Sequence, residues 1–158
     1  MARAPFQVLI LPFRQAADGD WQYGVLRRAD DAYWQGIAGG GEDGEGPLEA
    51  AMREMEEETG WRADEVVLYA LDTRDTVQAD CFEARKYWPA DVHVVPQYFY
   101  AARVEGLDVL LSKEHTEFRW SNYTDAYSAL KYDSNKTALW ELRERLNAGD
   151  LRRDERFG

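Results

Sequence analysis

The chain has 158 residues and a formal net charge of −11, with 45% hydrophobic and 31% charged residues. This length suits one domain with a substantial core, so we expect residues 1–158 to form a single domain. The negative charge argues against a nucleic-acid polymer or an anionic membrane as partner, because both would repel the protein. Cys81 is the only cysteine, which excludes an intrachain disulfide and favours the reducing cytoplasm.

The N-terminal part of the chain predicts a β-hairpin followed by a glycine run. The residue pattern indicates strands over 6–14 and 22–28, joined by a turn at 18–20. The apolar run at 8–11 is soon interrupted by proline and arginine, so it is too short for a membrane span or a signal peptide. Three consecutive glycines at 39–41 would let the backbone approach a phosphate or a metal ion closely.

A helix from Pro47 to about residue 59 carries the most informative side chains. Proline suits the first helical position, and the glycine that follows the helix suits a left-handed cap. Glu54, Glu57 and Glu58 cluster beside the apolar stripe of this helix, related as i, i+3 and i+4. Such carboxylates repel one another unless a cation neutralises them, and Mg²⁺ prefers oxygen ligands. An acidic helix face is often merely solvated, but the flanking glycines, proline and arginine favour a metal site.

The remainder of the chain predicts further strands and two terminal helices. We expect strands over 66–72, 92–104 and 118–120, a helix beginning near Thr124, and a last helix over 134–147. Residues 81–92 have no clear period, so they are interpreted as a long loop. Its aromatic residues either line a base pocket or anchor the loop to the surface.

The stretch 39–61 reads GGGEDGEGPLEAAMREMEEETGW and fills the pattern G-x5-E-x7-R-E-U-x-E-E-x-G-U, in which U is apolar. In this it resembles the Nudix hydrolases, which cleave a nucleoside diphosphate linked to a further moiety. The resemblance implies an α/β/α sandwich around a central mixed β-sheet, and the order of expected strands and helices agrees with it.

The resemblance also implies a reaction and a set of roles. Water attacks a phosphorus atom while Mg²⁺ or Mn²⁺ holds the charge of the diphosphate. Glu57 and Glu58 match the principal metal ligands, and a backbone carbonyl at or just before Gly39 commonly completes the set. Glu54 matches a residue that serves as ligand or as general base. Glu114 is the candidate for a further acid from outside this stretch, with Glu117 as the second choice.

Arg53 lies one turn before Glu57, near enough to orient its carboxylate by a charge-assisted hydrogen bond. We therefore include Arg53 in the catalytic set. His93 and His115, the only histidines, have no partner at metal-ligand spacing and are interpreted as ordinary strand or loop residues.

The run LRRADDAYWQ at 26–35 is similar to the RRxDxxxWQ segment of dihydroneopterin triphosphate pyrophosphohydrolases, as is the Glu-His pair at 114–115. This places four residues at the substrate: Arg27, Arg28, Trp34 and Gln35. The two arginines alternate at a strand end, so only one can face the cleft. Trp34 either stacks on a flat heterocycle or belongs to the core.

The expected function is metal-dependent hydrolysis of a diphosphate linkage in a small nucleoside or pterin triphosphate. Two alternatives stay open at this point: a Nudix-fold module that senses such a ligand without cleaving it, and an enzyme for a nucleotide sugar or dinucleotide. The three mutually repelling carboxylates favour catalysis, because a sensor has no need to keep them.

Overall fold

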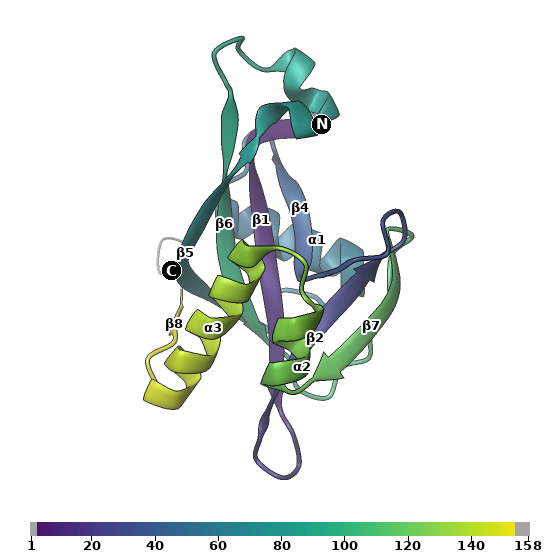
Figure 1. Cartoon of the computed structure of the whole chain (residues 1–158), viewed down its shortest axis with the longest axis vertical. Coiled ribbons are helices and arrows are strands. Elements are labelled where there is room, and N and C mark those ends of the chain that lie inside the picture. Colours follow the sequence, from purple (N-terminus) through teal and green to yellow (C-terminus); the bar gives the residue numbers. More distant parts are fainter. Residues whose placement is uncertain (1–2, 154–158) are drawn as a thin grey trace.

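The structure is a computed structural model that describes residues 3–153, and it is organised around the long strand β1 (Arg3–Gln15). β1 pairs antiparallel with β2 (Trp21–Arg28) through a hairpin and, along its first half, antiparallel with β4 (Ile37–Glu42). On its other edge it runs parallel to β6 (Val94–Arg103). The glycine run therefore lies within a strand of the sheet (Figure 1).

Eight strands of the described residues form one mixed sheet in the order β3-β2-β1-β6-β5-β8, with β4 added to β1 and β7 to β2. The remaining strands are β3 (Trp34–Gln35), β5 (Val67–Gln78), β7 (His115–Ser121) and β8 (Arg152–Arg153). β7 pairs antiparallel with β2 and places His115 opposite Arg28. This pairing joins the two segments that the sequence linked to substrate binding.

Helices cover both faces of the sheet (Figure 1). α1 (Pro47–Thr59) packs on one face, where its apolar side joins Val8, Ile10 and Tyr100 in one core cluster. α2 (Tyr123–Ala129) and α3 (Asp133–Ala148) pack on the other face against a second cluster that includes Leu9 and Phe99. Alternate residues of β1 thus serve opposite layers, and the expected α/β/α sandwich is confirmed.

The segment around residues 72–92 differs from the sequence-based expectation. β5 does not end near residue 72 but continues to Gln78, because it pairs with β6 as far as Val94. A short 3-10 helix at Ala79–Cys81 leads into the expected loop over 81–92, and a second one lies within it at Glu83–Tyr87. Figure 1 shows these turns at the top of a tall projection, above the start of β1. The polar continuation of β5 has no apolar period, so only its pairing with β6 defines it as a strand.

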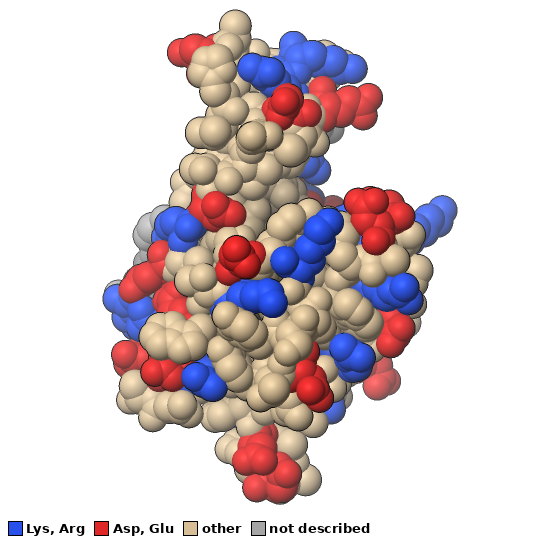
Figure 2. All heavy atoms as spheres, viewed as in Figure 1, with Lys and Arg blue, Asp and Glu red and all other residues tan. Residues whose placement is uncertain are grey.

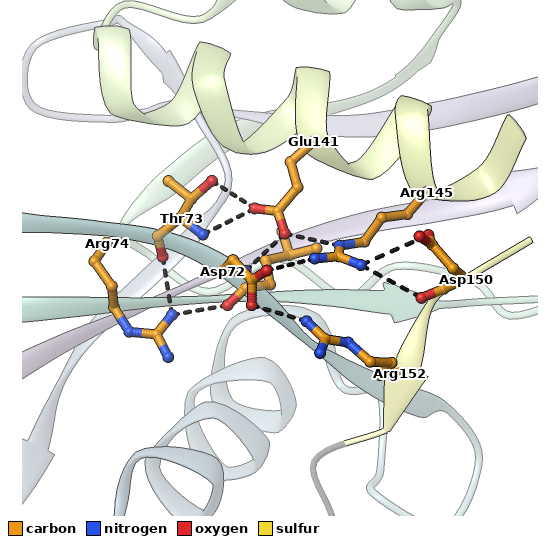
Figure 3. A network of polar contacts seen from close by, with 8 residues as sticks. Asp72, Thr73, Arg74, Glu141, Arg145, Asp150 and Arg152 are labelled. Atoms are coloured by element: carbon orange, nitrogen blue, oxygen red, sulfur yellow. Dashed lines mark hydrogen bonds and ion pairs between the residues drawn. The ribbon is translucent and has the colours of Figure 1, made fainter. Parts of the chain in front are cut away.

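A polar network attaches α3 to β5 at a shift of the β5–β6 register between Ala70 and Arg74 (Figure 3). The Glu141 carboxylate accepts hydrogen bonds from the backbone N–H groups of Asp72 and Thr73 at 2.6 and 2.8 Å. Arg145, one turn further along α3, donates to Glu141 at 2.8 Å. The network therefore satisfies backbone donors at the shift in register.

The face formed by α2 and α3 carries acidic and basic side chains interspersed, without an extended patch of one sign (Figure 2). Among residues 3–153, no helix is long and apolar enough to cross a membrane.

Candidate active site

α1 begins and ends as its sequence predicts. Gly46 precedes the helix, and its N–H donates to the Glu49 carboxylate at 3.0 Å; Pro47 follows at the first helical position. Gly60 ends the helix with φ 79°, and its N–H donates to the Glu56 carbonyl at 2.9 Å. Because the apolar side of α1 is fixed on the sheet, the neighbouring glutamates are directed at the edge formed by β4.

A pocket of about 290 Å³ lies between α1, β4 and the start of β7. Its lining consists mainly of glutamates and glycine backbone: Arg3, Gly39, Gly40, Gly41, Glu42, Arg53, Glu54, Glu57, Glu58 and Glu114. We call this the glutamate pocket. Every residue expected to hold metal, together with Arg53 and Glu114, is found here.

Arg53 organises the glutamate pocket from its rim. Its Nε and Nη2 donate to the two carboxylate oxygens of Glu45 at 2.8 and 3.0 Å, and Nη2 also donates to the Gly40 carbonyl at 2.8 Å. Its Nη1 donates to Glu54 at 3.0 Å and to Glu57 at 3.2 Å. This fork is stronger and more directional than a single ion pair, so Arg53 fixes α1 to β4 and orients two carboxylates.

Gly39 is required because Glu54 occupies the space in front of it. A Cβ at Gly39 would lie 2.0 Å from the Glu54 Cδ atom, which is a steric overlap with a buried side chain. Glycine therefore lets the β4 backbone approach the Glu54 carboxylate closely. The approach of this backbone to a phosphate or a metal ion stays a prediction.

Burial raises the pKa of Glu54 to about 7. The positive charge of Arg53 opposes this effect, while the negative charges of Glu57 and Glu58 add to it. Only 7% of Glu54 is exposed. At neutral pH and without bound metal, Glu54 is thus divided between its acid and carboxylate forms, which is the range suited to a general base.

Glu58 is held by residues far away in the sequence. Its Oε2 lies 2.8 Å from His115 Nδ1 and accepts a hydrogen bond from the Ser112 hydroxyl at 2.6 Å. Burial alone would raise the pKa of Glu58, but the hydrogen bonds from His115 and Ser112 outweigh it and lower the pKa. The carboxylate is therefore kept charged and in a fixed orientation, as a metal ligand requires.

Sequence reasoning missed this role of His115, whose side chain is fully buried. The Nε2 atom of the same ring lies 3.4 Å from Gln35 Nε2, and Gln35 is itself 5% exposed. Gln35 was expected at the substrate, but it lies behind His115 and supports the Glu58 side of the pocket. The similarity of the Glu-His pair to a known pattern was the one signal in the sequence that singled out His115.

Glu114 lies at the rim, where burial and then the charge of Glu58 raise its pKa. The Nη1 atom of Arg28 is 3.9 Å from Glu114, although Arg28 is mainly paired with Asp30 at 2.7 Å. Arg27 is exposed and donates to the Ala32 carbonyl at 3.3 Å. Of the two arginines, Arg28 is the one that contacts a residue of the glutamate pocket. The β2–β7 register shifts between Arg27 and Arg28, so the expected alternation of their side chains stays a prediction.

Trp34 lies in a different place from the glutamates. It packs against the core cluster beneath α2 and α3, and the Arg119 guanidinium lies 4.5 Å from its ring centroid. With Arg119 and Asn122 it lines a separate hollow of about 560 Å³ that shares no lining residue with the glutamate pocket. Of the two interpretations, this placement favours packing, and a stacking role stays a prediction.

The donor set of the glutamate pocket fits a hard divalent cation. Among residues 3–153, no group of three or more His, Cys, Asp or Glu side chains is already arranged so that it could hold a metal ion by itself. Mg²⁺ needs no such group, because it takes one or two carboxylates and completes its shell with water and substrate phosphates. The carboxylates beside the glycine backbone of β4 would supply that partial shell.

Comparison with known proteins agrees with the site and the fold. The NUDIX domain profile matches residues 9–142. The solved structure of a NUDIX hydrolase from Listeria monocytogenes has a TM-score of 0.85 and 41% identity, covering 96% of this chain and 100% of that one. Dihydroneopterin triphosphate diphosphatase of Escherichia coli is 27% identical over 139 residues, which are 87% of this chain and 91% of that protein. RNA pyrophosphohydrolase of Roseobacter denitrificans is 31% identical over 127 residues, which are 76% of this chain and 79% of that protein.

The chain therefore belongs to the NUDIX family. It is a Nudix hydrolase, as the pattern in residues 39–61 predicts.

Proposed function

We propose that this Nudix hydrolase cleaves a diphosphate linkage in a small nucleoside or pterin triphosphate, with Mg²⁺ or Mn²⁺ as cofactor. The observation that carries the proposal is the convergence of Glu54, Glu57, Glu58 and Glu114 on one pocket beside the glycine backbone of β4. The similarity to the dihydroneopterin triphosphate diphosphatase of Escherichia coli supports this substrate class.

The residues of the glutamate pocket would have different roles, which follow from their surroundings. Glu57 and Glu58 would hold the cation, with Glu54 and the backbone at Gly39 beside them. When bound, the cation neutralises the diphosphate and lowers the pKa of the attacking water. Arg53 acts through Glu54 and Glu57, which makes it a positioning residue.

Two carboxylates are candidates for the general base. Glu54, whose pKa is about 7, is suited to take the proton from water because that value matches neutral conditions. Glu114 is the alternative, since its pKa is also raised and it lies at the open rim.

On the substrate side, Arg28 would contact a phosphate at the rim, because its Nη1 atom is 3.9 Å from Glu114. Contacts of Arg27, Trp34 and Gln35 with the substrate stay predictions, and none of these three residues lines the glutamate pocket. The single-domain organisation over 1–158 stays a prediction. So does the cytoplasmic location, which rests on the lone, exposed Cys81.

A screen for phosphate or diphosphate release tests the function. The purified full chain is incubated with nucleoside triphosphates, dihydroneopterin triphosphate, nucleotide sugars and dinucleoside polyphosphates, each with Mg²⁺ or Mn²⁺. We expect the triphosphates to be hydrolysed fastest and EDTA to abolish the reaction. Tight binding of a ligand without turnover would favour the sensing module, and cleavage confined to the sugars or dinucleotides would overturn the substrate class.

A further inference from the structure

A second hollow adjoins the glutamate pocket beneath the cap, by which we mean residues 79–92 between β5 and β6. It measures about 530 Å³ and is lined by Arg3 and by cap residues that include Phe82, Glu83, Lys86 and Tyr87. Figure 1 shows the cap above the start of β1. Arg3 also lines the glutamate pocket, so the two hollows meet at this side chain.

Arg3 is held in place through its backbone while its side chain stays available. It is paired with Glu42 of β4, and its carbonyl accepts a hydrogen bond from the Trp88 indole of the cap at 2.7 Å. Its guanidinium lies against Gly40, where a Cβ would come within 2.5 Å of the Cζ atom. Within residues 3–153 the guanidinium has no hydrogen-bond or ion-pair partner. An uncompensated cation at the mouth of the pocket is suited to an anionic ligand.

The cap side of the hollow offers a flat apolar surface together with a second cation. Tyr87 is 76% exposed, and the Lys86 ammonium lies 5.2 Å from its ring centroid. Phe82 packs against Trp88 with ring centroids 5.9 Å apart. Trp88 is the residue whose indole connects the cap to Arg3. A large exposed ring on an anchored turn provides a stacking platform for a heterocycle.

We propose that the hollow beneath the cap holds the heterocyclic end of the substrate, stacked on Tyr87. Arg3 then contacts the phosphate that lies between the heterocycle and the glutamate pocket. This inference rests on the proposed function, and it names the part of the chain that selects the substrate. The ligand class is an aromatic heterocycle that carries a polyphosphate.

The geometry favours this hollow over the one beside Trp34. The Trp34 hollow shares no lining residue with the glutamate pocket, and Trp34 packs with the layer of α2 and α3. The hollow beneath the cap shares Arg3 with the glutamate pocket. A substrate that spans the two adjoining hollows keeps its phosphates beside Glu57 and Glu58 without crossing the sheet.

The test compares KM for the triphosphate that is hydrolysed fastest with the inhibition constant of inorganic tripolyphosphate, which lacks a heterocycle. In Tyr87→Ala we expect KM to rise about tenfold, with kcat and the tripolyphosphate constant within about twofold of wild type. Tyr87→Phe should retain the wild-type KM. In Arg3→Gln both KM and the tripolyphosphate constant should rise, and Arg3→Lys should restore part of the loss.

Tyr132→Ala is the matched control, because it removes another exposed tyrosine that lines neither hollow; its KM should not change. Thermal melts verify that each variant is folded. A Tyr87→Ala variant with wild-type KM would overturn the inference, and so would a parallel rise of its tripolyphosphate constant. A raised KM in Trp34→Leu alone would assign the heterocycle to the Trp34 hollow.

If none of the compounds is hydrolysed, the proposed function is overturned, but the inference about the hollow beneath the cap can still be tested. The inference is then decided by calorimetric binding of adenosine triphosphate and dihydroneopterin triphosphate to wild type and to Tyr87→Ala. Weaker binding to Tyr87→Ala supports it, and equal or absent binding overturns it.

Discussion

At the scale of single residues, the glutamate pocket shows how the local environment shifts the pKa values of two glutamates in opposite directions. Glu54 and Glu58 both belong to α1 and both are nearly buried. Burial raises the pKa of Glu54, whereas hydrogen bonds from His115 and Ser112 overcome burial and lower the pKa of Glu58. One carboxylate is thus prepared to exchange a proton and the other to remain a charged ligand.

Glu58→Gln should reduce kcat by about a hundredfold or more, because it removes a charged metal ligand. The amide keeps the shape of the side chain, so the variant should stay folded. The measurement is steady-state turnover of the best triphosphate, with circular dichroism as a check on folding. Glu56→Gln is the matched control, since Glu56 is exposed on the same helix and its loss should leave kcat unchanged. Near-wild-type turnover in Glu58→Gln would refute the assignment.

Metal binding should release protons at about pH 6.5, because a ligating carboxylate must lose its proton and the pKa of Glu54 is about 7. Calorimetric titrations with Mg²⁺ in two buffers of different ionisation enthalpy measure the number released. The release should fall toward zero at about pH 8.5, and it should be smaller in Glu54→Gln. Identical heats in the two buffers at the lower pH would contradict the raised pKa.

At the scale of elements, α1 and α3 are each fixed to the sheet by a set of polar contacts in addition to their apolar sides. Arg53 connects α1 to Glu45 and to the Gly40 carbonyl of β4. Glu141 connects α3 to the irregular part of β5 (Figure 3). The first connection keeps the glutamates in front of the glycine backbone, and the second fixes the strand that leads into the cap.

Glu141→Gln should destabilise the fold by about 1–2 kcal/mol, because charge-assisted bonds to two backbone N–H groups and to Arg145 are weakened. Chemical denaturation at pH 7 measures the change. Glu144→Gln is the control, since that carboxylate is about half exposed and makes only a 3.7 Å ion pair. Equal unfolding free energies for Glu141→Gln and wild type would show that the network adds nothing.

The same residue gives a pH dependence of defined sign. Burial by itself would raise the pKa of Glu141, but the hydrogen bonds from Thr73, Asp72 and Arg145 outweigh burial and lower this pKa in the folded state. The stabilisation is therefore present above the ordinary glutamate pKa and is lost as the pH falls through the folded-state value. The difference in unfolding free energy between wild type and Glu141→Gln should accordingly shrink in acid.

At the scale of the whole molecule, Mg²⁺ should stabilise the fold, because it relieves the repulsion among Glu54, Glu57 and Glu58 and binds only the native state. At a metal concentration a hundredfold above Kd, the melting temperature should rise by about 5 °C or more. Thermal melts with Mg²⁺ and with EDTA measure the shift. It should be reduced in Glu58→Gln, and the absence of both a shift and a calorimetric heat of binding would contradict a metal site.

The sequence by itself determined the local features of this protein. The helix α1 begins and ends where Pro47 and Gly60 predict, and the spacing of Glu54, Glu57 and Glu58 places them on one face. These outcomes follow from helix geometry and capping, which involve residues at most a few positions apart. The family and the sandwich fold could also be predicted from the sequence, because the pattern of residues 39–61 is continuous in the chain.

Only the tertiary structure decided which distant residues complete the site. His115 reaches Glu58 across 57 positions of sequence, and Arg3 reaches the backbone of Gly40. Gln35 and Trp34 are adjacent in sequence, yet Gln35 lies behind the glutamate pocket and Trp34 packs beneath α2 and α3. Strand pairing makes these choices, since neighbouring strand residues point to opposite faces and a register slip of one residue would exchange them.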